Sequence, residues 1–130
     1  MSDIPQDLLY SEDHEYVKRT SDDGDEVLVG ITDFAQGELG DIVYIELPEP
    51  GTAFNNGEVF GTIEAVKAVS DLYCPVEGEV LEVNDGLDDD PAVVNTDPYG
   101  EGWMLRLKVV HVEDLDALLS CDAYADLVSH

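Results

Sequence analysis

Lysine is scarce in this sequence, and one of its three lysines lies where a covalent attachment site would be expected. Lys18, Lys67 and Lys108 are the complete set. Lys67 stands in GTIEAVKAVSD, so small or apolar residues flank it in a chain that is otherwise crowded with carboxylates. The strand-like stretches on both sides predict a tight hairpin that projects the amine into water, as a modifying enzyme and a mobile cofactor arm would require. An ordinary solvated lysine is the alternative that these residues leave open.

Other chemical groups form no recognisable catalytic or metal-binding pattern. His14, His111 and His130 are too scattered to predict a zinc site, and we expect them to be solvated or to lie at strand ends. The acidic run at 85–90, DGLDDD, lacks the bidentate Glu and the sixth-position Gly of a calcium loop, so a solvated loop is expected there. No Gly-rich phosphate loop and no convincing Ser-His-Asp set is present. We therefore expect no catalytic residue and no metal ligand.

The cellular compartment is indicated by the cysteines and by the apolar runs. Cys74 and Cys121 lie far apart and in no CxxC arrangement, which favours two reduced thiols over a disulfide. The acidic N-terminus MSDIPQDLLYSEDHE lacks the basic start and apolar core of a signal peptide. Apolar runs of only a few residues cannot span a bilayer. A cytoplasmic location is expected.

The net charge is extreme. Thirty-one Asp and Glu residues stand against five Lys and Arg residues, for a formal net charge of -26. Such a surface repels nucleic acid and anionic lipid, so neither is an expected partner. Apolar residues make up 44% of the chain in regular patterns, which argues against disorder. Self-repulsion of this size is screened at molar salt, so we interpret the chain as a folded protein from a halophile.

Short segments of period-two character dominate the first 110 residues and predict a mainly β fold in one domain, residues 1–130. Residues 15–19 and 26–31 flank SDDGD, whose Asp and Gly residues suit a hairpin turn. A largely buried strand is expected at 41–47. Further strands are expected at 58–64, at 78–83 and at 103–110, where Trp103, Leu105, Leu107 and Val109 share one face.

Three segments have helical character. Residues 32–39 predict a short helix with Thr32 or Asp33 as the N-cap and Gly40 just past its end. After a β core at about 10–112, helices are expected at about 113–128. Leucines at helical spacing occupy 113–119, and Tyr124, Leu127 and Val128 continue the pattern at 121–128.

A weak internal repeat divides the β core. Pro48-x-x-Gly51 recurs as Pro75-x-x-Gly78, and each unit is followed by an Asn-x-Gly turn, at 55–57 and at 84–86. Two similar strand-turn units suggest a sheet sandwich with approximate two-fold symmetry and with Lys67 between the halves. PxxG is common in all-β chains, so the repeat is thin evidence by itself.

Consecutive blocks of the sequence resemble the glycine cleavage system H protein family. These are GITDFAQGELGDIVYIELPEPG, GTIEAVKAVSDLYCPVEGEVLEVN, DPYGEGWMLRLK and EDLDALL, which cover about residues 10–127 in the family's order. Biotin carriers place Met on both sides of the acceptor lysine, whereas Val66 and Ala68 flank Lys67 here. The resemblance implies a barrel-sandwich hybrid of the lipoyl/biotinyl type with short helices.

The resemblance also implies a carrier that is not an enzyme. Lipoate would be amide-linked to Lys67. The carrier would shuttle the aminomethyl group of glycine from a pyridoxal-phosphate glycine decarboxylase to an aminomethyltransferase, and electrons to dihydrolipoyl dehydrogenase. A lipoate-attaching enzyme is the remaining expected partner. Alternatives left open are an H-like protein that relays lipoyl groups to other complexes, a carboxylate-based hydrolase and a structural interaction module.

By motif match, Glu15 in DHEYV and Asp71 in SDLY would line a surface cleft for the loaded arm. A buried or half-buried carboxylate there could hold a cationic amine by a charge-assisted hydrogen bond. As a substitution on a surface cleft, Glu15→Gln would barely change the stability of the unloaded protein. The sequence departs from the family's usual pattern at Asp13, where a small hydroxyl residue or another polar one is common, and at Tyr16, where Trp is common.

Overall fold

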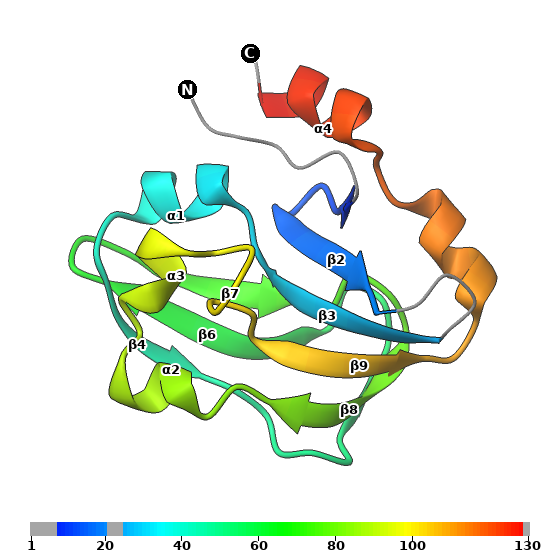
Figure 1. The fold of residues 1–130 in the computed structure, drawn as a ribbon, viewed down its shortest axis with the longest axis horizontal. Helices are drawn as coiled ribbons and strands as arrows, with labels where there is room; N and C mark the ends of the chain where they lie inside the picture. Colours follow the sequence, from blue (N-terminus) through cyan, green and yellow to red (C-terminus); the bar gives the residue numbers. More distant parts are fainter. Residues whose placement is uncertain (1–7, 21–24, 129–130) are drawn as a thin grey trace.

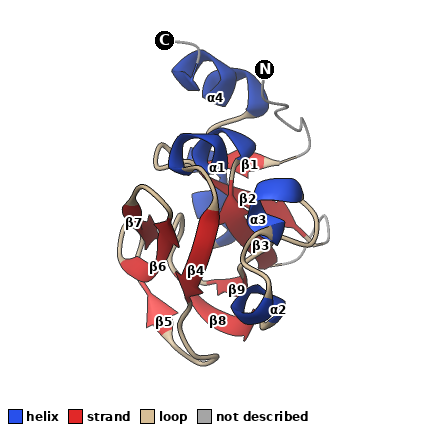
Figure 2. Ribbon diagram, turned by 90° about the vertical axis from the view of Figure 1, so that its left-hand side faces the viewer, coloured by secondary structure: helices blue, strands red, loops and turns tan. Residues whose placement is uncertain are grey.

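The computed structural model describes residues 8–20 and 25–128, which form two antiparallel sheets facing each other as a sandwich (Figures 1 and 2). Across the larger sheet the strands are β1 (Leu9–Tyr10), β2 (Glu15–Arg19), β3 (Glu26–Ile31), β9 (Leu105–Val109), β8 (Gly78–Val83) and β5 (Ala53–Phe54). The smaller sheet contains β4 (Ile42–Glu46), β6 (Val59–Ala65) and β7 (Val69–Tyr73). The mainly β sandwich predicted from the sequence is confirmed.

Strands with clean alternation lie where the sequence places them. The ranges 15–19, 26–31 and 78–83 match β2, β3 and β8. β9 begins two residues later than predicted, after Trp103, but Leu105, Leu107 and Val109 are all buried on its inner face. The turn SDDGD between β2 and β3 lies largely outside the described residues.

The strand predicted at 41–47 is present as β4, but the prediction that it is largely buried is wrong. In β4 only Ile42 and Ile45 are buried, whereas Val43 is 55% exposed and Tyr44 is 48% exposed. The pairing of β4 with β6 shifts register between Ile42 and Tyr44. Such an irregularity breaks the two-residue alternation, so two successive apolar side chains face away from the core.

The two PxxG units lie against each other. The Gly51 N–H donates to the Val80 carbonyl at 2.7 Å, and the Val80 N–H donates to the Thr52 carbonyl at 2.8 Å. The second Asn-x-Gly unit leads into helix α2 (Gly86–Asp89), followed by α3 (Val93–Thr96). The solvated loop expected at 85–90 is therefore partly helical, because Leu87 is buried in the core while its acidic neighbours stay exposed.

The C-terminal segment is less helical than its leucine spacing predicts. Residues Val112–Ala117 form the 3₁₀-helix η1, in which Leu115 is buried. Leu119 then exchanges two backbone hydrogen bonds with Tyr10, at 2.9 and 2.7 Å, so this stretch is extended along β1. Helix α4 (Cys121–Val128) follows and lies at the same end of the molecule as β1 (Figures 1 and 2).

Within the described ranges, no helix has the length and apolar character that a bilayer span requires. Cys74 and Cys121 both lie in these ranges and form no disulfide. The Cys74 thiol is buried and donates to the Val76 carbonyl at 3.0 Å. Its removal from water raises its pKa to about 12, which makes it unreactive near neutral pH.

Candidate functional site

Lys67 occupies the tip of a short hairpin that is held at two points. β6 and β7 are joined by Val66, Lys67 and Ala68, all exposed. The Ala65 N–H donates to the Ala68 carbonyl at 2.7 Å and closes the loop. The Val66 N–H donates to the carbonyl of Asp41, just before β4, at 2.9 Å. The lysine therefore projects from a loop whose backbone is tied down on both sides.

The stem of Lys67 lies over Gly40, at the end of helix α1 (Asp33–Leu39). A Cβ placed on Gly40 would stand 2.9 Å from Cε of Lys67 and 3.7 Å from its Nζ. Gly40 also has a φ of 84°, a conformation that favours glycine, and its N–H donates to the Gln36 carbonyl to end the helix. The sequence predicts the helix end, but it gives no sign that the same glycine makes room for the lysine.

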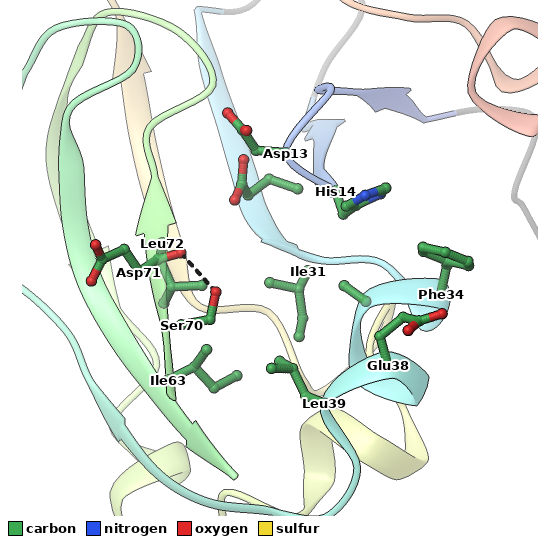
Figure 3. Close-up of a pocket in the computed structure, with 12 residues that line it drawn as sticks. Asp13, His14, Ile31, Phe34, Glu38, Leu39, Ile63, Ser70, Asp71 and Leu72 are labelled. Atoms are coloured by element: carbon green, nitrogen blue, oxygen red, sulfur yellow. Dashed lines mark hydrogen bonds between the residues drawn. The ribbon is translucent and has the colours of Figure 1, made fainter. Parts of the chain in front are cut away.

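A cavity of about 440 Å³ lies between α1 and β7 (Figure 3). The turn before β2 closes its third side, through Asp13 and His14. Glu38 and Leu39 from the last turn of α1 line the cavity, so its wall adjoins Gly40 and the lysine stem. The complete lining is Asp13, His14, Glu15, Ile31, Phe34, Ala35, Glu38, Leu39, Ile63, Ser70, Asp71 and Leu72.

Glu15 is a buried acid in the wall of this cavity. The residue as a whole is only 2% exposed. The Ser11 hydroxyl donates to Oε1 at 2.8 Å, and the Tyr73 N–H lies 3.4 Å from Oε2. Removal from water raises the pKa of Glu15 to about 8, and the charge of Asp13 adds to the rise, while the hydrogen bonds oppose it. The expectation that Glu15→Gln is a surface substitution with little effect on stability is wrong, because β2 carries Glu15 into the interior.

Asp71 contributes to the cavity wall, but its carboxylate points away from the cavity (Figure 3). Successive side chains of a strand face opposite sides, so Ser70 and Leu72 of β7 point inward where Asp71 points outward. The Ser70 hydroxyl lies 3.4 Å from the Asp71 carbonyl oxygen. The structure thus brings Glu15 and Ser70 to the cavity and directs the Asp71 carboxylate to solvent.

The two departures from the family's usual pattern lie in different places. Asp13 is exposed at the cavity, where it and Glu38 add negative charge. Tyr16 is fully buried outside the cavity lining, and its hydroxyl donates to the Pro98 carbonyl at 2.7 Å. Gly30 allows this packing, because a Cβ there would stand 2.7 Å from the Tyr16 ring. The Tyr16 departure therefore concerns the core.

His14 is a cavity residue that the sequence does not reveal. It was expected to be solvated or to lie at a strand end. It directly precedes β2, is half-buried, and its Nδ1 lies 2.8 Å from the Tyr124 hydroxyl. Burial lowers the pKa of His14 despite the charges of Asp13 and Glu38. His111 is exposed as predicted, and His130 lies outside the described residues. Across the described part of the chain, no group of three or more His, Cys, Asp or Glu side chains could hold a metal ion.

Comparisons with known proteins agree over nearly the whole chain. The family model for "Glycine cleavage H-protein" matches residues 8–130. The chain is 54% identical to the glycine cleavage system H protein of Chlorobium phaeobacteroides, with 96% of this chain and 97% of the relative covered. Identity is 56% to the H protein of Rubrobacter xylanophilus, with 96% and 94% covered, and 52% to the probable H protein of Haloarcula marismortui, with 97% of each covered.

A crystal structure of a glycine cleavage system H protein from Mycobacterium marinum superimposes with a TM-score of 0.85 at 41% identity. The alignment covers 95% of this chain and 97% of that one. Sequence and fold agree on one assignment. The chain belongs to the glycine cleavage H-protein family.

Proposed function

We propose that Lys67 is the residue through which this chain carries its lipoyl group. The carrier role follows from the family: the chain is a non-catalytic lipoyl carrier of the glycine cleavage system. The observation that supports Lys67 is its place at a pinned hairpin tip, with its stem over Gly40 and beside the cavity. Lys18 lies within β2 and Lys108 within β9, and neither has a comparable loop.

The residues present fit a lipoyl-lysine. A side chain larger than hydrogen at position 40 would occupy the space that the lysine stem uses. Lipoate supplies, when attached, a disulfide that can accept a one-carbon amine unit and electrons. The chain's own residues hold the lysine at a fixed tip, which keeps the attached group at a high effective concentration near each docked partner. We propose glycine decarboxylase, aminomethyltransferase, dihydrolipoyl dehydrogenase and a lipoate-attaching enzyme as those partners.

We assign the amine-binding role to Glu15. Its carboxyl lies in a partly closed cavity, where an ion pair is stronger than in water. A cationic amine that enters would favour the ionised carboxylate, so the proton held on Glu15 near neutral pH would be released. The exposed residues Asp13 and Glu38 line the cavity, and their carboxylates make it attractive to a cation. The Asp71 carboxylate takes no part in this assignment, because it faces the other way.

The proposed attachment site is tested by peptide mass mapping of protein purified from its own cells. We expect the lipoyl mass increment on the peptide that contains Lys67, since this is the one lysine displayed on a hairpin tip among those described. Peptides containing Lys18 and Lys108 should have their unmodified masses and serve as internal controls. A lipoyl increment on either of them, or a biotin increment on Lys67, would contradict the assignment.

We further propose that the chain works in a saline cytoplasm. The support is its formal net charge of -26, which must be screened for the compact state to be stable. The Debye length shrinks from roughly 10 Å at 0.1 M salt to about 3 Å at 1 M, so repulsion between surface carboxylates fades over that range.

The midpoint of thermal unfolding should therefore rise steadily from low to molar potassium chloride. Sucrose at equal osmolality is the control, because it favours the compact state by exclusion without screening charge. At low total concentration, we expect potassium chloride to raise the unfolding midpoint clearly more than sucrose does. A midpoint that stays level with salt would remove the support for a saline environment and leave the carrier role untouched.

A further inference from the structure

We propose that Tyr124 of the C-terminal helix α4 is a positioning residue for the cavity, because its hydroxyl joins two segments that form adjoining walls. The hydroxyl lies 2.8 Å from Nδ1 of His14 and 2.7 Å from Oγ1 of Thr32. Tyr124 and Thr32 are both fully buried. Neither Tyr124 nor Thr32 lines the cavity itself. The proposal deepens the function proposed above, and part of its test does not depend on that function.

The first wall held by Tyr124 is the turn that carries Glu15. His14 has a φ of 70°, in the left-handed region that a non-glycine residue seldom adopts, so the turn needs contacts that hold it there. The His14 N–H donates to the Ser11 carbonyl at 3.1 Å, and its carbonyl accepts from the Thr32 N–H at 3.0 Å. The next residue is Glu15, whose Oε1 accepts from Ser11 in the same turn. Movement of His14 would therefore move the buried acid and its donor together.

The second wall is helix α1. Thr32 is its N-cap, and Oγ1 accepts the Ala35 N–H at 3.2 Å. A helix of seven residues has little stability of its own, so its start depends on the cap and on packing. Phe34, Ala35, Glu38 and Leu39 of this helix line the cavity. The His14 ring also lies against Phe34, with ring centroids 5.0 Å apart, so the two walls meet beneath the Tyr124 hydroxyl.

The hydroxyl and the ring of Tyr124 do different things. The ring stacks on Tyr10 of β1, with centroids 4.6 Å apart and an interplanar angle of 10°, and this contact attaches α4 to the sheet. Tyr124→Phe keeps the ring and removes only the two hydrogen bonds. If Tyr124 is only a structural anchor, the variant should lose little stability and leave Glu15 unaffected. If Tyr124 is a positioning residue, the loss of its hydroxyl should alter the surroundings of Glu15.

The primary measurement is the titration of the Glu15 carboxyl, followed by carbon NMR in unloaded protein. Titratable groups that interact with Glu15 by charge are Asp13 in the same turn, Cys74 after β7 and Tyr124 itself. His14 precedes Glu15 in the turn, and burial lowers its pKa. Near pH 8 the phenol is uncharged, since burial raises its pKa to about 12, so Tyr124→Phe changes no charge. We expect the Glu15 midpoint to fall by at least about one pH unit toward its ordinary value as water reaches the loosened turn.

Tyr44→Phe is the matched control, because it deletes a phenol hydroxyl from an exposed side chain of β4 that does not line the cavity. It should leave the Glu15 midpoint unchanged. Thr32→Val tests the other end of the link, and Thr32→Ser, which keeps the hydroxyl, should restore the wild-type midpoint. These two variants carry the test if Tyr124→Phe does not fold. A wild-type Glu15 midpoint in folded Tyr124→Phe or Thr32→Val overturns the proposal.

A second readout rests on the proposed function. Isolated, aminomethyl-loaded protein should release ammonia at least about threefold faster in Tyr124→Phe than in Tyr44→Phe, at equal lipoylation and similar unfolding midpoint. An unchanged release rate in Tyr124→Phe, when Glu15→Gln does accelerate release, counts against the proposal. If Glu15→Gln itself leaves release unchanged, the sheltering role of Glu15 is what fails, and the titration still decides the positioning role of Tyr124.

Discussion

Lys67→Arg is expected to abolish the carrier function while leaving the fold intact. The guanidinium keeps the positive charge and a similar stem over Gly40, but it stays protonated and cannot form the amide that attaches lipoate. Intact mass after incubation with a lipoate-attaching enzyme should show no increment, and glycine cleavage in a mixture reconstituted with the other components should fall to the level without carrier.

Lys18→Arg and Lys108→Arg are the matched controls for this loss. Both make the same chemical change at exposed strand residues on the larger sheet, away from the Lys67 hairpin. Each should accept lipoate and support turnover at the wild-type rate. A lipoyl increment on Lys67→Arg, or loss of modification in one of the two controls, would move the attachment site elsewhere and refute the assignment.

Glu15→Gln is expected to flatten a fall in stability that the wild-type protein shows between about pH 4.5 and pH 8. The folded-state pKa of Glu15 is raised from 4.5 to about 8 by burial, so the folded state holds a proton that the unfolded state has lost in this window. Its favourable contribution is fully present below pH 4.5 and is lost as pH rises through about 8. At about 1.4 kcal/mol per pKa unit, the loss reaches at most about 5 kcal/mol.

Denaturant unfolding at a series of pH values measures this difference. From pH 5 to pH 8.5, the free energy of unfolding of Glu15→Gln should rise steadily relative to that of wild type. Asp71→Asn is the informative comparison, because it neutralises an exposed carboxylate outside the cavity and should run parallel to wild type. A pH-independent gap between wild type and Glu15→Gln would mean that the carboxyl is ionised at neutral pH without cost.

The same variant should also expose the loaded arm to water. Loss of a charge-assisted hydrogen bond costs about 1–3 kcal/mol, which corresponds to roughly a five- to 150-fold shift between docked and free arm. Ammonia release from isolated, aminomethyl-loaded Glu15→Gln should be faster by a factor in that range, and Asp71→Asn should match wild type. Equal acceleration in both variants would show that the two carboxylates act together and that the orientation of Asp71 is not decisive.

Local sequence patterns determined most of the architecture. Period-two alternation identified β2, β3 and β8 at their observed bounds. Gly40 marked the end of α1, and Thr32 or Asp33 its start, of which Thr32 is the N-cap. These features are readable because each depends on residues close together in the chain. The small and apolar neighbours of Lys67 between two strands predicted its hairpin for the same reason. The carrier role was predicted from blocks of sequence that resemble the family and occur in its order, and family membership confirms it.

Contacts between distant segments decided the chemistry of the cavity. Glu15 and Asp71 are both acidic strand residues, yet one is buried beside Ser11 and the other faces water, because the strands bring opposite faces to the cavity. The raised pKa of Glu15 follows from that burial and is invisible in the sequence. The irregular pairing of β4 and the extended stretch at Leu119 likewise depend on partners far along the chain.

Gly40 and Tyr124 show why such features escape sequence reasoning. Gly40 is explained locally as a helix end, and Tyr124 as an apolar position of α4. Each has a second role that depends on a residue 27 or more positions away in the sequence. The close approach of Lys67 to Gly40 and the reach of Tyr124 to His14 exist only when the chain is folded. Periodicity reports which face of a segment is buried, and the tertiary structure alone decides what that face meets.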